Sequence, residues 1–207
     1  GSGPSGINGW LNYDIGILPW LSKRPRLRHF ICTFGLLPKK YDVNWPEIQL
    51  VDIRRQFPLD DNSVDYIYCS QVIEHFERYE ALNILEESYR VLKPDGILRV
   101  SVPDIGKMLI NYKDESAKDP ERAARELNVL WWGYEKDIEP NIIGKFSKFF
   151  IRDHQWHYDM VSMKKLLTEA GFAKAKTLSF RKGETPDLER VEIDIHKKHS
   201  LYLEAKK

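Results

Sequence analysis

The chain has 207 residues, of which 42% are hydrophobic and 12% aromatic, so it is long enough to bury one substantial core. Lys and Arg (32) nearly balance Asp and Glu (31), and the net charge of +1 gives no overall field that would attract nucleic acid or an anionic membrane. No nucleic-acid partner and no transmembrane segment are expected. The two cysteines, Cys32 and Cys69, have neither metal-site nor disulfide spacing and favour a cytoplasmic location.

Six short runs of apolar, β-branched or aromatic residues are predicted strands, and helical patterns separate several of them. An alternation of strand and helix favours a mostly parallel sheet. The predicted strands are Leu11–Ile15, Ile48–Ile53, Val64–Ser70, Ile97–Pro103, Ala173–Phe180 and Ser200–Ala205.

Two helices are predicted from apolar spacing and from end signals. Apolar side chains recur at three- and four-residue steps from Leu82 to Leu92, and the Pro and Gly of 93–96 end this crossover helix. A second helix is predicted to begin near Ser162, as its N-cap, and to stop at Gly171.

Two segments have compositions that suggest contact with a partner. Residues 17–38 mix basic with aromatic side chains, which suits either a helix packed on the sheet or a peripheral contact with phosphorylated or lipid-linked acceptors. Three prolines favour the first interpretation. Residues 105–160 are too many for a single connection between two strands, and they are rich in aromatic side chains. They are predicted to form an insertion that covers an acceptor site as a mobile lid. A homodimer interface is the alternative.

A set of motifs follows the predicted strands in order. The chain opens with glycines at 1, 3 and 6, a pattern that suits a backbone turn close to a ligand and also occurs in expression scars. The strand 11–15 contains Asp14, and an acidic residue at a strand end can accept both hydroxyls of a ribose. Next come Asp52-Ile53, the acidic loop 60–65, and a strand that ends at Ser70 before Val72-Ile73-Glu74-His75.

In these motifs the chain resembles the class I S-adenosylmethionine-dependent methyltransferases, specifically the small bacterial methyltransferase type 11-like family. The resemblance implies one methyltransferase domain over 1–207, with a Rossmann-like, doubly wound and mostly parallel α/β sheet and an antiparallel strand at its edge. It also implies S-adenosylmethionine as the cofactor. The residues it would place at the cofactor are Gly1, Gly3, Asp14, Asp52, Ile53 and Ser70.

The resemblance leaves one strand unaccounted for. In this fold the glycine-rich loop follows the first, central strand, yet the sequence begins inside the loop. We therefore expect about 5–10 further upstream residues, the usual length of such a strand. That strand would lie between Leu11–Ile15 and Val64–Ser70, and its absence puts Gly1 in doubt as a site residue.

The catalytic candidates are His75, His154 and Tyr158, which the resemblance places on the cleft side or on the insertion above it. Asp104, His157 and Tyr112 are weaker candidates of the same kind, and each of these groups could instead serve as an ordinary cap or core residue. Residues 152–159 carry only two histidines, three apart, so no metal is expected there.

The expected reaction is methyl transfer to a small-molecule or glycan acceptor, whose identity the sequence does not give. Two other functions stay open. A relative that binds the cofactor without turnover could act as a partner subunit. A nicotinamide-dependent enzyme would use the same crevice, but it has no reason to carry the motifs from Asp52 to His75.

Overall fold

The computed structural model describes residues 3–133 and 153–207. These residues divide into two compact units, one made of residues 3–57 and the other of residues 58–133 and 153–207. We describe each unit by itself and call them the N-terminal unit and the main unit.

The N-terminal unit contains a small parallel sheet and short helices. Its two strands, β1 and β2, pair with Asn12 opposite Ile48. The buried Asn12 amide donates to the carbonyls of Ile7, Trp10 and Glu47, so one side chain fixes the loop before β1. The elements are η1 (Gly3–Ser5), β1 (Asn12–Asp14), α1 (Ile17–Ser22), α2 (Pro25–Thr33), η2 (Lys39–Tyr41) and β2 (Ile48–Leu50).

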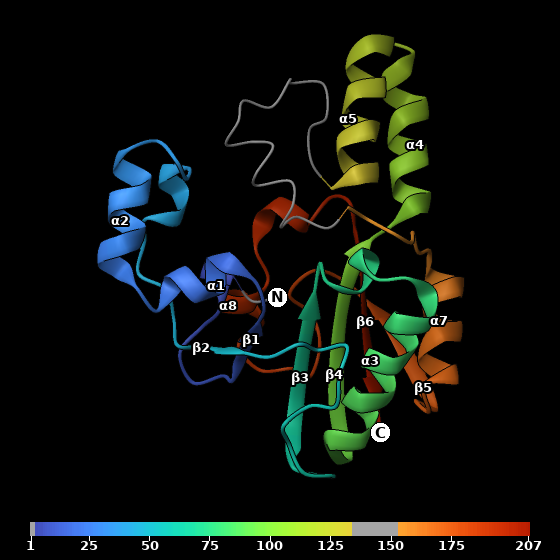
Figure 1. Ribbon diagram of the computed structural model, residues 1–207. Coiled ribbons are helices and arrows are strands. Elements are labelled where there is room, and N and C mark those ends of the chain that lie inside the picture. Colours follow the sequence, from blue (N-terminus) through green and yellow to red (C-terminus); the bar gives the residue numbers. More distant parts are fainter. Residues whose placement is uncertain (1–2, 134–152) are drawn as a thin grey trace. The chain divides into compact units, whose positions relative to one another are not determined.

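The main unit is built on a four-stranded sheet in the order β3-β4-β6-β5 (Figure 1). Strands β3 and β4 are parallel, and β6 is antiparallel to both β4 and β5, so β3, β4 and β5 share one direction. The elements are β3 (Val64–Ser70), η3 (Ile73–His75), α3 (Arg78–Val91), β4 (Leu92–Pro103), α4 (Ile105–Ser116), α5 (Pro120–Trp132), α7 (Met160–Glu169), β5 (Lys174–Leu178), α8 (Leu188–Val191), η4 (Asp194–His196) and β6 (Ser200–Lys206).

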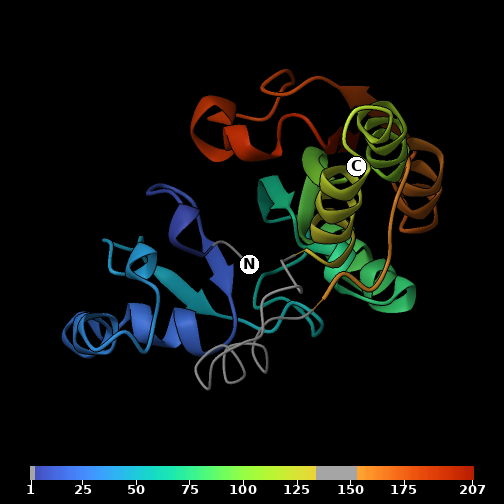
Figure 2. The same ribbon diagram turned by 90° about the horizontal axis from the view of Figure 1, so that it is seen from above.

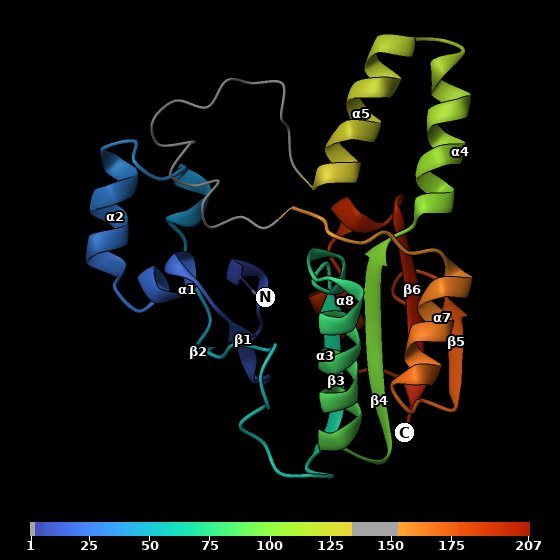
Figure 3. The same ribbon diagram turned by 45° about the vertical axis from the view of Figure 1, so that its right-hand side comes forward.

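Helices α3 and α7 lie side by side on one face of this sheet (Figures 1 and 3). Each begins with a reciprocal capping box, Glu77 with Glu80 in α3 and Asp159 with Ser162 in α7, which satisfies backbone N–H groups of the first turn. Their inward faces are fully buried at positions such as Leu85, and burial of such side chains is the main force that holds helix to sheet.

Helices α4 and α5 form a hairpin beyond the carboxyl end of β4; Figures 1 and 3 show them running next to each other, and Figure 2 looks along the pair. The carboxylate of Asp104 caps α4 by accepting from the N–H of Gly106, 3.0 Å away, and Asp119 caps α5 in the same way. This hairpin begins the insertion predicted at 105–160. The later part, residues 134–152, lies outside the described residues, so the lid stays a prediction.

A buried ion pair ties β4 to the segment that follows β5. The Arg99 side chain is completely buried, and its guanidinium lies 2.6 Å from the carboxylate of Glu192. It also donates to the carbonyls of Ser179 and Lys182. The neighbouring buried Glu204 accepts from two backbone N–H groups, those of residues 184 and 185. Every charge in this network is thus met inside the protein.

The predicted α/β class and sheet are confirmed, with two corrections. The antiparallel strand, β6, lies inside the sheet between β4 and β5 and not at its edge. The N-cap of α7 is Asp159, and Ser162 is the third residue of the helix, where it completes the capping box. Within residues 3–133 and 153–207, no helix is both long and apolar enough to cross a membrane.

Candidate functional site

In the N-terminal unit, two predicted cofactor residues follow neighbouring strands. Asp14 is the last residue of β1, and Asp52 comes two residues after the end of β2. The N–H of Val51 donates to the carbonyl of Asp14 over 3.1 Å, so the pairing continues to this point. The Asp14 carboxylate accepts from the N–H of Ile15. Both carboxylates therefore lie at the carboxyl edge of the small parallel sheet, where α/β proteins bind ligands.

The Asp52 carboxylate is held by a neighbouring cation. The Nε and Nη2 atoms of Arg54 donate to its two oxygens over 2.9 and 2.8 Å. These hydrogen bonds hold the pKa of Asp52 below its ordinary value, although partial burial acts in the opposite direction. The carboxylate is thus kept charged and oriented. Ile53 is half-buried beside it and Gly3 lies in η1, whereas Gly1 lies outside the described residues.

In the main unit, Ser70 ends β3 and the chain then turns sharply. Gln71 has a φ of +52°, a left-handed conformation that costs energy for a residue with a side chain. Its N–H donates to the carbonyl of Ser101, and its amide donates to the hydroxyl of Ser200. The turn leads into η3, which carries Glu74 and His75 beyond the end of the strand.

A second segment, residues 153–158, lies against η3. The carbonyl of Glu74 accepts from the N–H groups of Gln155, at 2.7 Å, and Trp156, at 3.2 Å. Tyr158 forms a parallel bridge with Asp104, the residue that follows β4. These backbone contacts place residues 153–158 across the carboxyl ends of the main sheet.

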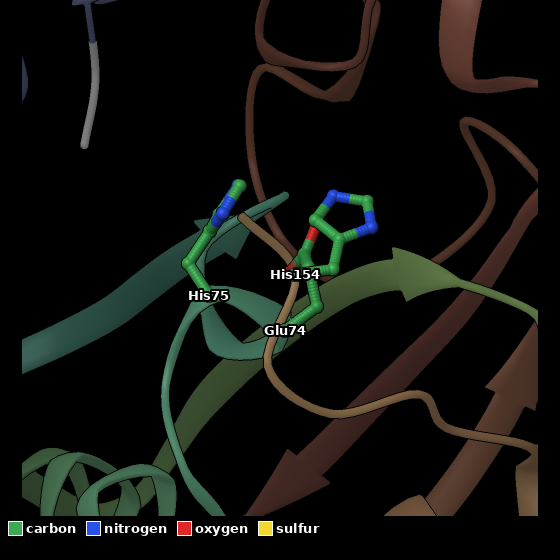
Figure 4. Close-up of side chains that lie close together, drawn as sticks. All are labelled: Glu74, His75 and His154. Carbon is green, nitrogen blue, oxygen red and sulfur yellow. The ribbon is translucent and has the colours of Figure 1, made fainter. Parts of the chain in front are cut away.

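The result is a cluster of Glu74, His75 and His154 (Figure 4). The imidazole centroids of His75 and His154 are 4.8 Å apart, and one ligand atom from each of the three residues lies within 4.8 Å of the others. His157 flanks the cluster: its ring stacks on Trp131 at 4.1 Å and its Nε2 is 2.8 Å from the Trp131 carbonyl.

The cluster is buried, and burial dominates its electrostatics. Glu74 is 1% exposed, and neither carboxylate oxygen has a hydrogen-bond partner among the described residues. Burial raises the pKa of Glu74 to about 8. Burial also lowers the pKa of His154 to about 4, and the neighbouring His75 and His157 act in the same direction.

Two of the three catalytic candidates thus come together. The third, Tyr158, is 1% exposed; its hydroxyl has no partner within the described part of the chain, and burial raises its pKa. Of the weaker candidates, Asp104 is the N-cap of α4. Glu74 was not among the candidates expected from the sequence, where the available signal was its position directly before His75.

Comparison with known proteins finds similarity to methyltransferases. Residues 37–100, which include Asp52, Ser70 and His75, match the family model described as "Methyltransferase domain". Among curated proteins, the chain is 29% identical over 124 residues to an uncharacterized methyltransferase-like protein of Schizosaccharomyces pombe, covering 58% of the chain and 43% of that protein. It is 26% identical over 153 residues to a demethylmenaquinone methyltransferase of Oceanobacillus iheyensis, covering 70% and 56% respectively.

The chain thus spans about half the length of these curated relatives. Among solved structures, an S-adenosylmethionine-dependent methyltransferase from Methanosarcina mazei is similar with a TM-score of 0.49 and 16% identity, covering 94% of the chain and 80% of that structure. The family-model match and the methyltransferase-named curated relatives thus agree that residues 37–100 are similar to a methyltransferase domain.

Proposed function

We propose that the protein transfers the methyl group of S-adenosylmethionine to a small-molecule or glycan acceptor. The observation that carries the reaction is the family match over residues 37–100, because it covers the strand-end motif at Asp52 and the turn from Ser70 to His75. The choice of acceptor class rests on analogy with the family and on the aromatic residues of the 105–160 segment, which suit a sugar or planar group.

For the cofactor, we assign Asp14 to the ribose hydroxyls and Asp52 to the adenine amino group. The support is their position after two parallel, directly paired strands. Because Arg54 holds the Asp52 carboxylate charged and in place, that carboxylate is preorganised to accept a hydrogen bond. Ile53 would lie beside the adenine ring, Gly3 by the methionine part, and Ser70 near the sulfonium.

For the acceptor, we assign His75 and His154 to the reacting side, with Tyr158 as a positioning residue. Methyl transfer from a sulfonium is an in-line displacement, so holding the acceptor at attack distance can supply much of the rate. The imidazole of His154, kept unprotonated by its burial, supports a role in orienting an acceptor on this side of the site. The position of His75 just after β3, with the segment around His154 bonded to the same turn, supports this role.

The same proposal includes the location of the protein and its contacts with partners. The cysteines, Cys32 and Cys69, are both unpaired among the described residues, which agrees with a reducing cytoplasm. Helix α2 exposes Leu27 and Phe30 beside arginines, and this supports a peripheral contact as an alternative to simple packing. A homodimer through the aromatic insertion is the alternative to a lid.

The first test is calorimetric titration of the full chain with S-adenosylhomocysteine and, in parallel, with NAD and NADP. The second test measures the transfer of label from S-adenosylmethionine to each of a panel of hydroxylated acceptors. Micromolar binding of the first ligand together with methylated product is expected. Binding without any product would indicate a partner subunit, and preference for a nicotinamide cofactor would overturn the assignment.

A further inference from the structure

The carboxylate of Glu74 is the starting observation. It is 1% exposed, and neither of its oxygens has a hydrogen-bond partner among the described residues. A buried carboxylate without a partner is costly, and proteins normally pair such groups with a cation, a hydrogen-bond donor or a metal ion. The buried, unpartnered Glu74 carboxylate therefore indicates a ligand at this place.

The surrounding groups show what kind of ligand this is. His75 and His154 each bring a ring nitrogen within 4.8 Å of a Glu74 carboxylate oxygen, and the Nδ1 atom of His154 is likewise buried without a hydrogen-bond partner in the described chain. Two imidazoles and one carboxylate form a donor set that borderline-soft divalent metals prefer.

We propose that Glu74, His75 and His154 bind one divalent transition-metal ion of the zinc type. The ligand atoms lie within 4.8 Å of one another. Two atoms bound to one zinc at about 2.1 Å are separated by about 3.4 Å in a tetrahedral site. Side-chain rotations that move the ligand atoms by about 1 Å would therefore bring all three to coordination distance. The chain at 153–158 is already fixed, because Gln155 and Trp156 both donate to the carbonyl of Glu74.

The donor set leaves a coordination position for a further ligand. Sites with two histidines and one glutamate are typical of zinc centres that keep an open position for water or a substrate oxygen. The predicted fourth ligand is therefore a water molecule or a hydroxyl oxygen. His157, whose Nε2 is 2.8 Å from the Trp131 carbonyl, flanks the site and is not assigned as a ligand. Magnesium is disfavoured because it prefers oxygen ligands.

The proposal is independent of methyl transfer, so its test uses no cofactor. Full-length protein is stripped with a chelator and titrated with Zn²⁺, Mn²⁺ and Mg²⁺ by calorimetry, and the absorption spectrum of the Co²⁺-loaded protein reports the coordination geometry. We expect one Zn²⁺ per chain, an intense visible Co²⁺ band, and a rise in Tm on adding Zn²⁺.

Variants localise the binding. Glu74→Gln preserves shape and removes the charge, and His154→Asn removes one imidazole; each should weaken Zn²⁺ binding at least tenfold and reduce the Co²⁺ band. His196→Asn is the matched control, because His196 lies in the main unit outside the cluster. Circular dichroism checks that each variant is folded, and a His75→Asn variant is used if either of the others is not.

Two results would overturn the proposal. One is no stoichiometric Zn²⁺ binding when Zn²⁺ is in 100-fold excess over protein. The other is an equal affinity for Zn²⁺ in the wild type and in folded Glu74→Gln and His154→Asn variants. Tight metal binding in a protein that transfers no methyl group would leave the metal site standing and refute only the proposed function.

Discussion

The imidazole of His154 lies directly against Gly133, at the end of α5. A Cβ atom on Gly133 would be 2.6 Å from Nε2 of His154, and Cβ atoms do not come within 3.0 Å of a non-bonded heavy atom in real structures. Gly133 also has a φ of +82°, which disfavours any residue with a side chain. The absence of a side chain at Gly133 therefore allows the His154 ring to pack against the end of α5.

We predict that Gly133→Ala destabilises the protein more than Gly171→Ala does. Both glycines have positive φ, so each substitution should cost about 1–2 kcal/mol of backbone strain. At Gly171 the added Cβ would make only ordinary contacts, at 3.4 Å, with Tyr89. At Gly133 it would displace His154 at a further cost of about 1–3 kcal/mol. Urea denaturation measures both; equal losses would show that His154 moves aside freely.

Replacement of Asp14 by Ala should weaken S-adenosylhomocysteine binding by about 1–3 kcal/mol, or about 5- to 150-fold, because charge-assisted hydrogen bonds to the ribose are lost. Calorimetry gives the affinity. Asp42→Ala is the control in the same unit, since Asp42 pairs with His29 and is not assigned to the cofactor. Unchanged affinity in Asp14→Ala would remove Asp14 from the site.

Breaking the buried ion pair at Arg99 should be far more damaging than breaking an exposed one. Arg99→Met leaves the buried carboxylate of Glu192 without its cation, which typically costs about 3–5 kcal/mol. Arg122→Met, which breaks an exposed pair with Glu126, should cost less than about 1 kcal/mol. Guanidinium denaturation compares the two. Adding Glu192→Gln to Arg99→Met should recover part of the loss, and no recovery would contradict the pairing.

The cap of α7 should give an acid-dependent contribution to stability. The N–H of Ser162 donates to Asp159 and holds the pKa of this carboxyl below its ordinary value. The ionised cap therefore stabilises the fold fully above the ordinary pKa of an aspartate, and this contribution is lost as the pH falls through the lowered pKa. Asp159→Ala should cost about 0.5–2 kcal/mol at neutral pH.

The acid dependence is measured by thermal melts from pH 7 downward. The difference in stability between the wild type and Asp159→Ala should shrink in acid. Asp159→Asn keeps a cap without a titrating charge, and its stability relative to the wild type should improve over the same range. A difference from the wild type that does not change with pH would refute the charged cap.

The sequence predicted the strands well because their apolar runs are local. The buried run of β4 is found where it was expected, although the strand starts earlier, at Leu92. The N-cap of α7 was predicted at Ser162 instead of Asp159, because both residues are common N-caps and they lie three positions apart. The interior place of β6 could not be read from local spacing, because strand order depends on contacts between distant segments.

The site was predictable only in part for a similar reason. His75 and His154 could be selected by residue type, and the order of the motifs pointed to Asp14 and Asp52. Glu74 became notable only in the folded chain, where residues about 80 positions later bond to its carbonyl and its carboxylate is buried. Burial and missing partners are properties of the folded chain, and periodicity does not reveal them.

The position of β6 has a consequence for how the main unit assembles. Strand β5 has β6 as its hydrogen-bonded neighbour in the sheet, and β6 is the last described strand of the sequence. During synthesis, β3 and β4 can pair as soon as they emerge, whereas β5 must wait for residues 200–206 to insert between it and β4. Until then, the edge of β4 is open to pairing with another chain. Ribosome-bound chains stalled before residue 200 should therefore be protease-sensitive at β5 and prone to aggregate, and release of the complete strand should remove both properties.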